Sequence, residues 1–291
     1  MIDQLVAALD VIDRCKDMYR RWKNPPQESV GSRFLRLFEE HGVHRNQIPR
    51  FFGHGLNVSD VQNDASLMLK LDEAILEDAC QRFAVRRTWL DGVDSRAYPC
   101  HHFATHPGDF AQFIAQLRAS NPEGELNALL IAPSRPALNA QALLVLQEYI
   151  GELGDKAVYR YHLCTDWVYE YWKSRAYLAA CVAVAWKAEV YVRGLIAAPE
   201  TIATYADGHT LLNEELIHKL DRSEIYPEDM ALDPVAFLYK LDFEDGNYGV
   251  REGLKLWLRL EQEGFMNLGR ISKNVRPAFQ AELEKYYPVQ R

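Results

Sequence analysis

Apolar residues recur at three- and four-residue intervals through the first third of the chain, which is the spacing of amphipathic helices. Over residues 1–23 this apolar set comprises Ile2, Leu5, Leu9, Ile12, Tyr19 and Trp22, and the pattern stops at Pro25 and Pro26. We expect one amphipathic helix there, which either packs on its own domain or forms a short dimer seam. Residues 30–92 keep the helical spacing in shorter pieces, separated by Gly42, Gly53, Gly55 and Gly92.

Beyond residue 107 the pattern becomes mixed. Short apolar or alternating runs predict four strands, which are Leu126–Ala132, Val158–Cys164, Tyr177–Trp186 and Glu189–Ala198. The third of these could instead continue a helix that begins at Asp166. Helical spacing predicts five helices, at Ala137–Leu153, Pro199–Tyr205, Leu211–Leu220, Gly253–Gly264 and Pro277–Tyr287. Strands mixed with helices indicate an α/β or α+β domain.

The helical spacing breaks between Asp91 and Pro107, where Gly92 and Pro99 also fall. A chain of 291 residues usually forms about two domains. We therefore expect a multidomain protein with an all-α domain over residues 1–92 and a linker over residues 93–106. Residues 107–291 then form an α/β or α+β domain for ligand sensing or oligomerisation.

Composition favours a cytoplasmic protein. Hydrophobic residues make up 48% of the chain, yet no apolar run approaches the ~20 residues that span a bilayer, so we expect no membrane partner. Asp3, Asp10 and Asp13 interrupt what would have to be the apolar core of a signal peptide. The five cysteines are odd in number and scattered, which suits reduced thiols rather than a disulfide framework.

The net charge of -8 argues against strong non-specific binding of nucleic acid. The charge is uneven, however, because residues 201–250 contain 11 acidic and 3 basic residues, whereas residues 1–50 are slightly basic. A locally basic face on the first domain is therefore compatible with the acidic total.

Three segments of the first domain follow one another as a helix-turn-helix unit does, with apolar positions that hold the helices and a glycine at the turn. They are GVHRNQIPRFFG at 42–53, VSDVQND at 58–64 and LEDACQRFAVRRTWLDG at 76–92. Over residues of about 30–92 the chain resembles the lambda-repressor-like Xre family. The resemblance implies a first helix that ends at Gly53, a recognition helix over Val58–Asp64 and closing helices over Leu76–Gly92.

The same resemblance implies which residues meet DNA. Carried over by position, the base-reading sites are Gly55, Leu56, Asn57 and Asp60, of which Asn57 can make a bidentate contact to adenine. Arg45 and Arg50 suit phosphates. We expect DNA contacts from Arg45, Arg50, Asn57, Ser59 and Gln62. Three features depart from the family: Pro49 lies within the first helix, the turn is one residue short, and Asp60 and Asp64 bring negative charge toward phosphates.

Other groups of residues give weaker indications of function. Cys100, His101, His102 and His106 fall within seven residues, and His102 and His106 could share a helix face as zinc ligands do, although a loop with partly buried imidazoles is the alternative. His162, Cys164 and Asp166 match no nucleophile motif, so we expect core packing. A dense aromatic set indicates either a ligand pocket or ordinary core, and comprises Tyr159, Tyr161, Trp167, Tyr169, Tyr171, Trp172, Tyr177 and Trp186.

No phosphate-binding or nucleophile-elbow glycine pattern occurs, so we expect no catalytic residues, no metal and no cofactor. The leading hypothesis is a dimeric DNA-binding transcriptional regulator that responds to a small-molecule or protein effector. The alternative is a protein-interaction adaptor on a vestigial helix-turn-helix scaffold that does not bind DNA. A metal-dependent enzyme in the second domain is the remaining hypothesis.

Overall fold

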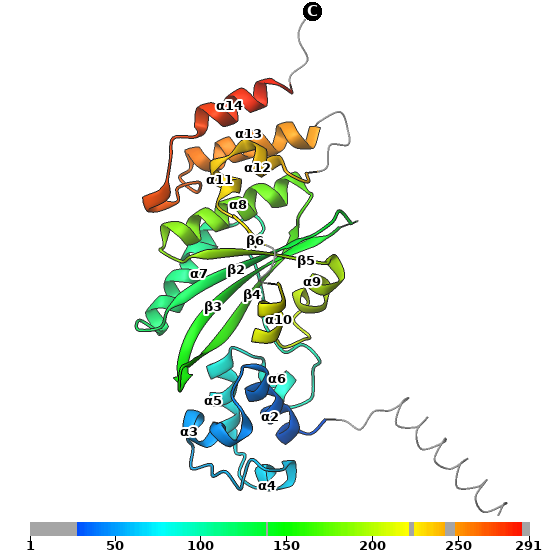
Figure 1. The fold of residues 1–291 in the computed structure, drawn as a ribbon, viewed down its shortest axis with the longest axis vertical. Helices are drawn as coiled ribbons and strands as arrows, with labels where there is room; N and C mark the ends of the chain where they lie inside the picture. Colours follow the sequence, from blue (N-terminus) through cyan, green and yellow to red (C-terminus); the bar gives the residue numbers. More distant parts are fainter. Residues whose placement is uncertain (1–27, 138, 221–223, 242–247, 287–291) are drawn as a thin grey trace, which may run out of the picture.

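Residues 28–137, 139–220, 224–241 and 248–286 are described by the computed structural model of the chain (Figure 1). The amphipathic helix expected over residues 1–23, and with it the dimer seam, lies outside the described residues. Within the described residues, no helix is both long and apolar enough to cross a membrane.

Residues 28–92 form a helical unit, as the spacing of apolar residues predicts. Its elements are α2 (Val30–Glu40), η1 (Arg45–Gln47), α3 (Ile48–Phe52), α4 (Asp64–Met68), α5 (Glu73–Phe83) and α6 (Arg87–Leu90). Ser29 and Asp72 begin α2 and α5 as N-caps, because their side chains accept hydrogen bonds from backbone N–H groups in the first turn. The centre is aromatic: the Phe38 ring lies 4.8 Å from Phe34, 5.1 Å from Phe52 and 4.9 Å from Phe83 between centroids.

The rest of the chain is built on a mixed sheet of six strands in the order β1-β4-β3-β2-β5-β6. The strands are β1 (Cys100–His102), β2 (Leu126–Pro133), β3 (Gln141–Leu153), β4 (Lys156–Val168), β5 (Val192–Ala197) and β6 (Glu224–Ile225). Strands β2, β3 and β4 form an antiparallel meander, while β5 pairs parallel with β2 and β1 pairs parallel with β4. The mixture of helices and strands expected for this region is confirmed.

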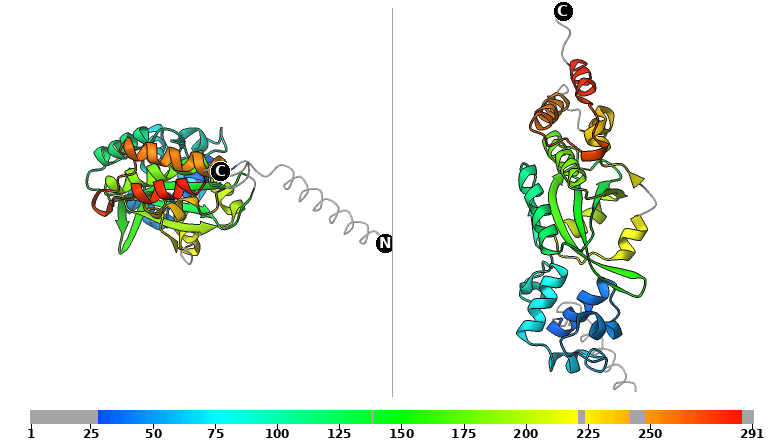
Figure 2. Two further views of the ribbon diagram at one scale, coloured as in Figure 1. Left: turned by 90° about the horizontal axis from the view of Figure 1, so that it is seen from above. Right: turned by 90° about the vertical axis from the view of Figure 1, so that its left-hand side faces the viewer.

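Helices cover both faces of the sheet. They are α7 (Pro107–Ser120), α8 (Trp172–Lys187), α9 (Pro199–Ala206), α10 (Glu214–Leu220), α11 (Asp229–Leu232), α12 (Pro234–Leu238), α13 (Tyr248–Gln262), η2 (Gly269–Ile271) and α14 (Arg276–Glu284). Helices α7 and α8 lie on one face, with α13 and α14 stacked beyond α8, and α9, α10 and the helical unit lie toward the other face (Figures 1 and 2). The molecule is therefore elongated, with the helical unit at one end.

The alternation of side chains along β2 divides the buried residues into two cores. Ala128 and Leu130 pack with α7 and α8, whereas Leu129 and Ile131 pack in one cluster with the phenylalanines of the helical unit. The helical unit thus shares its hydrophobic core with one face of the sheet.

Three expected elements differ from the structure. Ala137–Leu153 is the strand β3 from Gln141 onward, because consecutive buried residues on a strand covered on both faces imitate helical spacing. Tyr177–Trp186 belongs to helix α8, which was the alternative for that segment. The recognition helix expected over Val58–Asp64 is wrong: residues 58–61 are turns, and α4 begins at Asp64.

The segment expected as a linker, residues 93–106, contains strand β1, although its histidines and prolines indicated a loop. Strands β2, β4 and β5 and helices α9, α10, α13 and α14 lie where the pattern predicted such elements, within a few residues at each end.

Candidate functional site

The residues expected to contact DNA lie on the surface of the helical unit, over residues 45–62. Arg45 donates from Nε to Glu39 Oε1 at 2.8 Å and reaches the carbonyl of Gln62 with Nη1 at 3.5 Å. Gln62 donates from Nε2 to Asn46 Oδ1 at 2.8 Å. The structure therefore brings Arg45 and Gln62 together across the gap between η1 and the turn before α4.

Arg50, Asn57 and Ser59 are exposed. The backbone N–H of Asn57 donates to Asp60 Oδ2 at 2.8 Å, and its side-chain amide lies 3.4 Å from the same oxygen, so Asp60 shapes this turn locally. Leu56 is only 6% exposed and packs in the core, so its expected place among base-reading residues is wrong.

Asp64 is directed into the protein, not toward a phosphate as expected. Its Oδ2 accepts a hydrogen bond from Ser29 Oγ at 2.5 Å, which ties the start of α4 to the start of α2. Pro49 lies in the first turn of α3, where the missing N–H costs little, and the helix is interrupted between η1 and α3 directly before it.

The arginines toward the end of the helical unit are neutralised by acids of the same unit. Arg87 donates to both carboxylate oxygens of Glu73, at 2.5 and 2.9 Å, and to Asp91 at 2.9 Å. These hydrogen bonds raise the pKa of Arg87 and, together with the charge of Arg87, lower the pKa of Glu73. A broad positive face that includes Arg87 is therefore not formed.

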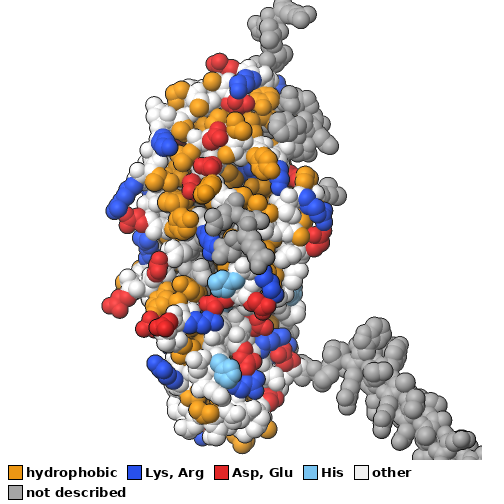
Figure 3. Space-filling model, viewed as in Figure 1, with side chains coloured by type: hydrophobic (Ala, Val, Ile, Leu, Met, Phe, Trp, Pro, Cys, Tyr) orange, Lys and Arg blue, Asp and Glu red, His pale blue; other side chains and the backbone are white. Residues whose placement is uncertain are grey.

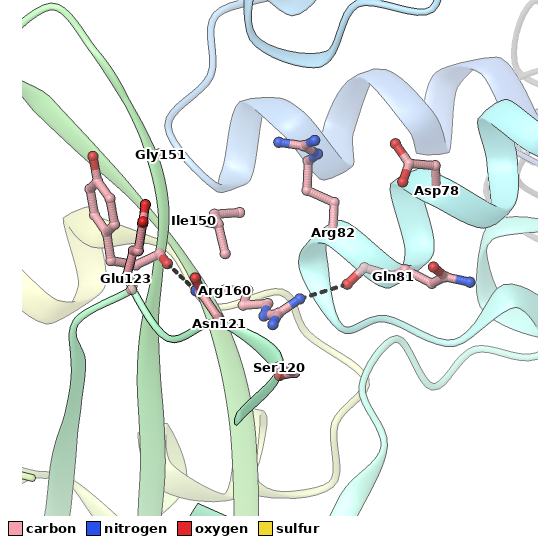
Figure 4. Close-up of a pocket in the computed structure, with 11 residues that line it drawn as sticks. Asp78, Gln81, Arg82, Ser120, Asn121, Glu123, Ile150, Gly151 and Arg160 are labelled. Atoms are coloured by element: carbon pink, nitrogen blue, oxygen red, sulfur yellow. Dashed lines mark hydrogen bonds between the residues drawn. The ribbon is translucent and has the colours of Figure 1, made fainter. Parts of the chain in front are cut away.

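A polar cleft of about 510 Å³ lies between α5 of the helical unit and the end of the sheet (Figure 4). Its walls come from α5, from the loop after α7 and from the β3–β4 hairpin, and are Asp78, Gln81, Arg82, Ser120, Asn121, Glu123, Gly124, Tyr149, Ile150, Gly151 and Arg160. Figure 4 shows Arg160 directed toward Gln81, and Nη1 of Arg160 donates to the Gln81 carbonyl at 3.1 Å. This cleft therefore lies at the junction between the helical unit and the sheet.

A buried carboxylate lies behind the cleft. Glu148, which is 1% exposed, accepts hydrogen bonds from Arg160 Nε at 2.7 Å and Nη2 at 2.6 Å, from Asn121 Nδ2 at 3.0 Å, and lies 2.8 Å from His162 Nε2. Burial raises the pKa of Glu148, but the hydrogen bonds from His162 and Arg160 outweigh it and lower the pKa to about 2. A carboxylate with both oxygens occupied in this way is a structural anchor rather than a general base.

Sequence reasoning missed this cluster, which we call the Glu148 cluster (Asn121, Glu148, Arg160 and His162). The available signal was the alternation in β4, where Arg160 and His162 share a face, opposite a glutamate in the apolar strand β3. Cys164, on the same strand, is fully buried in the core, as expected for packing, and burial raises the pKa of its thiol.

The Cys100–His106 segment does not assemble a metal site. His101 packs its ring 4.4 Å from Phe113, His102 Nδ1 pairs with Asp166 Oδ2 at 2.7 Å, and His106 Nδ1 bonds to Thr105. Among the described residues, no group of three or more His, Cys, Asp or Glu side chains is arranged to hold a metal ion.

Of the aromatic residues expected to form either a ligand pocket or ordinary core, some are buried in the cores and others line cavities. Tyr161, Trp167 and Tyr177 are buried in the cores. Tyr169 lines a cavity beside α11 and α12, while Tyr171 and Trp172 line another cavity, of about 440 Å³, beside α13.

Comparison of the chain with known proteins finds no matching family model, no matching curated protein and no matching solved structure.

Proposed function

We propose that this chain is a DNA-binding transcriptional regulator that acts as a homodimer, with the helical unit on duplex DNA and the sheet region sensing an effector. The observation that carries this proposal is the placement of Arg45, Arg50, Asn57, Ser59 and Gln62 on one surface stretch, residues 45–62. Arginine and amide side chains at the end of a helix and in the turn after it suit phosphates and base edges. The resemblance of Leu76–Gly92 to the closing helices of lambda-repressor-like domains supports the same assignment.

Few residues of the helical unit are available to contact DNA, and their number sets the expected affinity and salt dependence of binding. Each protomer offers two arginines to phosphates, and Arg45 must loosen its pair with Glu39 to do so. A dimer therefore contacts about four phosphates, and each contact adds about 0.9 to the slope of log affinity against log salt. We expect a slope near 3.6 and modest affinity, in keeping with the net charge of -8.

The test is selection of binding sites from random duplex DNA at two salt concentrations, followed by titration of the enriched site. Arg50→Ala should weaken binding and reduce the salt slope by about 1.8 per dimer, whereas Asn57→Ala should relax the preference for one base pair. Arg270→Ala is the control, because Arg270 is also an exposed arginine but lies at the far end of the molecule. Binding by Arg50→Ala and Asn57→Ala that equals binding by Arg270→Ala would overturn the proposal.

A second candidate, the protein-interaction adaptor, is favoured by a separate observation. Val58, Met68 and Leu69 are large apolar residues that are 49%, 45% and 87% exposed; Val58 lies in the turn that replaces a recognition helix, and Met68 and Leu69 lie at the end of α4, the helix that follows. Exposed apolar residues of this kind suit a protein surface better than phosphates. A photo-crosslinking residue at position 69, compared with one at position 270, distinguishes the candidates, because only the adaptor should give a discrete protein adduct specific to position 69.

A further inference from the structure

A cavity of about 430 Å³ lies at the carboxyl ends of the parallel strands β2 and β5, against α11 and α12. Its apolar walls are Ala132, Pro133, Tyr169, Ile196, Ile225, Tyr226, Pro227, Met230, Val235, Ala236 and Tyr239. Its volume is typical of small-molecule sites, and the carboxyl ends of parallel strands are where α/β sheets commonly bind ligands. We call it the Tyr226–Tyr239 pocket.

The mouth of this pocket is aromatic and open. Tyr226 is 66% exposed, Tyr239 is 64% exposed and Val235 is 67% exposed, although all three are large apolar side chains. Figure 3 shows hydrophobic side chains gathered over the part of the molecule that contains α11, α12 and α13. Exposed apolar groups that line a concave site are characteristic of ligand binding rather than of ordinary surface.

The walls are held in place by a buried arginine. Arg175 is fully buried and donates to the carbonyls of Tyr169 (2.8 and 3.1 Å), Phe237 (3.1 Å) and Tyr239 (3.0 Å). Its guanidinium carbon lies 3.7 Å from the centroid of the Tyr169 ring. The floor at Tyr169 and the mouth at Tyr239 are thus tied to the same side chain, which preorganises the pocket.

The polar groups of the pocket are mainly acidic. Asp229 and Asp233 line it, and burial together with the charge of Asp233 raises the pKa of Asp229, which Lys273 offsets only in part. Among the described residues, neither carboxylate forms an ion pair. Lys240, the one basic residue of the lining, directs its ammonium to the carbonyls of Pro133 and Ser134 at 3.1 and 2.9 Å, and the same ammonium lies 5.3 Å from the centroid of the Tyr239 ring.

We propose that the Tyr226–Tyr239 pocket binds a small organic ammonium ion with an aromatic or aliphatic body. A cation beside the exposed Tyr226 ring gains from the negative face of that ring, and it relieves the repulsion between Asp229 and Asp233. The body of the ligand would fill the apolar floor formed by the sheet and Met230. This inference does not depend on DNA binding.

The test is isothermal titration of the full chain with phenethylamine, phenethyl alcohol and phenylacetate, which share a body and differ in charge. We expect phenethylamine to bind at least 10-fold more tightly than the alcohol, and phenylacetate not to bind. Asp229→Asn should lower the affinity for the amine about 10-fold without changing the affinity for the alcohol. Tyr226→Ala should weaken binding of both, and it should leave folding intact because the ring is largely exposed.

Tyr191→Ala is the matched control, because Tyr191 is an exposed tyrosine directly before β5, at the opposite end of the parallel strands, and does not line this pocket. Equal affinity for the amine and the alcohol, or a loss of affinity in Tyr191→Ala as large as in Tyr226→Ala, would overturn the proposal. So would the absence of phenethylamine binding at millimolar concentration. None of these readouts involves DNA, so failure here is distinct from failure of the proposed regulator function.

Discussion

Glu148 illustrates how a carboxylate is kept charged inside a sheet. Desolvation opposes the charge, and the bidentate guanidinium of Arg160, the imidazole of His162 and the amide of Asn121 together reverse that penalty. Because Arg160 also donates to the carbonyl of Gln81, the same side chain fixes the position of α5. The cluster therefore acts on the cleft indirectly, by holding its walls.

Glu148→Gln should lower the free energy of unfolding at pH 7 by about 3 kcal/mol, because removing one partner leaves Arg160 poorly compensated. The pH dependence has a definite sign. The folded pKa, about 2, lies below the ordinary value of 4.5, so the stabilisation is present above pH 4.5 and is lost as the pH falls toward 2. Urea denaturation of both proteins at pH 7, 4.5 and 3 measures this difference. A difference that stays constant down to pH 3 would show that the charge of Glu148 does not stabilise the fold.

At the scale of elements, two backbone positions decide how the helical unit turns. Gly53 ends α3 with φ 81° and ψ -121°, a conformation essentially restricted to glycine. Ala84 ends α5 in the left-handed conformation with φ 54° and ψ 39°, where glycine is the usual residue.

Substitutions at these two positions should therefore have opposite effects. Gly53→Ala should destabilise by about 1–3 kcal/mol through backbone strain alone, since no atom lies within 4 Å of an added Cβ. Ala84→Gly should stabilise by up to about 1 kcal/mol. Thermal melts of both variants beside the unsubstituted chain make the comparison. Destabilisation by Ala84→Gly would mean that its methyl group contributes more through packing than it costs in strain.

The sequence predicted those elements whose spacing was set by one exposed and one buried face. Helices α9, α13 and α14 are of this kind, whereas β2, β4 and β5 were predicted from short apolar or alternating runs. Strand β3 was missed because Ala142–Leu146 is buried on both faces, so its apolar run has no period of two. The turn at residues 58–61 was missed because Val58 and Val61 keep helical spacing although only Val61 is buried.

The candidate sites were less predictable, because they depend on which distant segments meet. Arg45 and Gln62 were expected at the surface, but the pairing of Arg45 with Glu39 follows from the angle between α2 and η1. The β3–β4 hairpin places Arg160 opposite Glu148, but nothing local indicates that Asn121 converges on the same carboxylate. The Tyr226–Tyr239 pocket likewise forms only when α11 and α12 pack against the ends of β2 and β5.

For the whole molecule, the sheet separates two hydrophobic cores, and the helical unit belongs to one of them. His41 lies at this junction: it is 2% exposed, its Nδ1 lies 2.7 Å from the Leu37 carbonyl, and its ring is 4.4 Å from Phe83 and 5.6 Å from Tyr161 of β4. Charging this imidazole would therefore act on the contact between the helical unit and the sheet.

Acid should weaken that contact. Burial lowers the pKa of His41 to about 4, against an opposing hydrogen bond to Leu37, so the unfolded chain takes up the proton first. The stabilisation from neutral His41 is complete above pH 6.5 and is lost as the pH falls from 6.5 to about 4. His41→Gln should be less stable at pH 7 but should show a smaller loss between pH 6.5 and 5, measured by urea denaturation. An identical loss in both proteins would place the sensitivity elsewhere, with His101, whose pKa is also about 4, as the next candidate.

A core shared between the helical unit and the sheet also predicts that the chain unfolds in one step. Calorimetry should give a single transition in which the calorimetric and van't Hoff enthalpies agree. Phe83→Ala, in the core of the helical unit, and Phe237→Ala, on α12 in the opposite core, should each cost about 3–5 kcal/mol. Each should move the whole transition downward by roughly 5–8 °C. If the helical unit were instead an independent domain, the melt would show two transitions, and each substitution would shift only one of them. The shared core over Leu129, Ile131 and the helical unit argues for the single transition, because unfolding either part exposes the apolar face of the other.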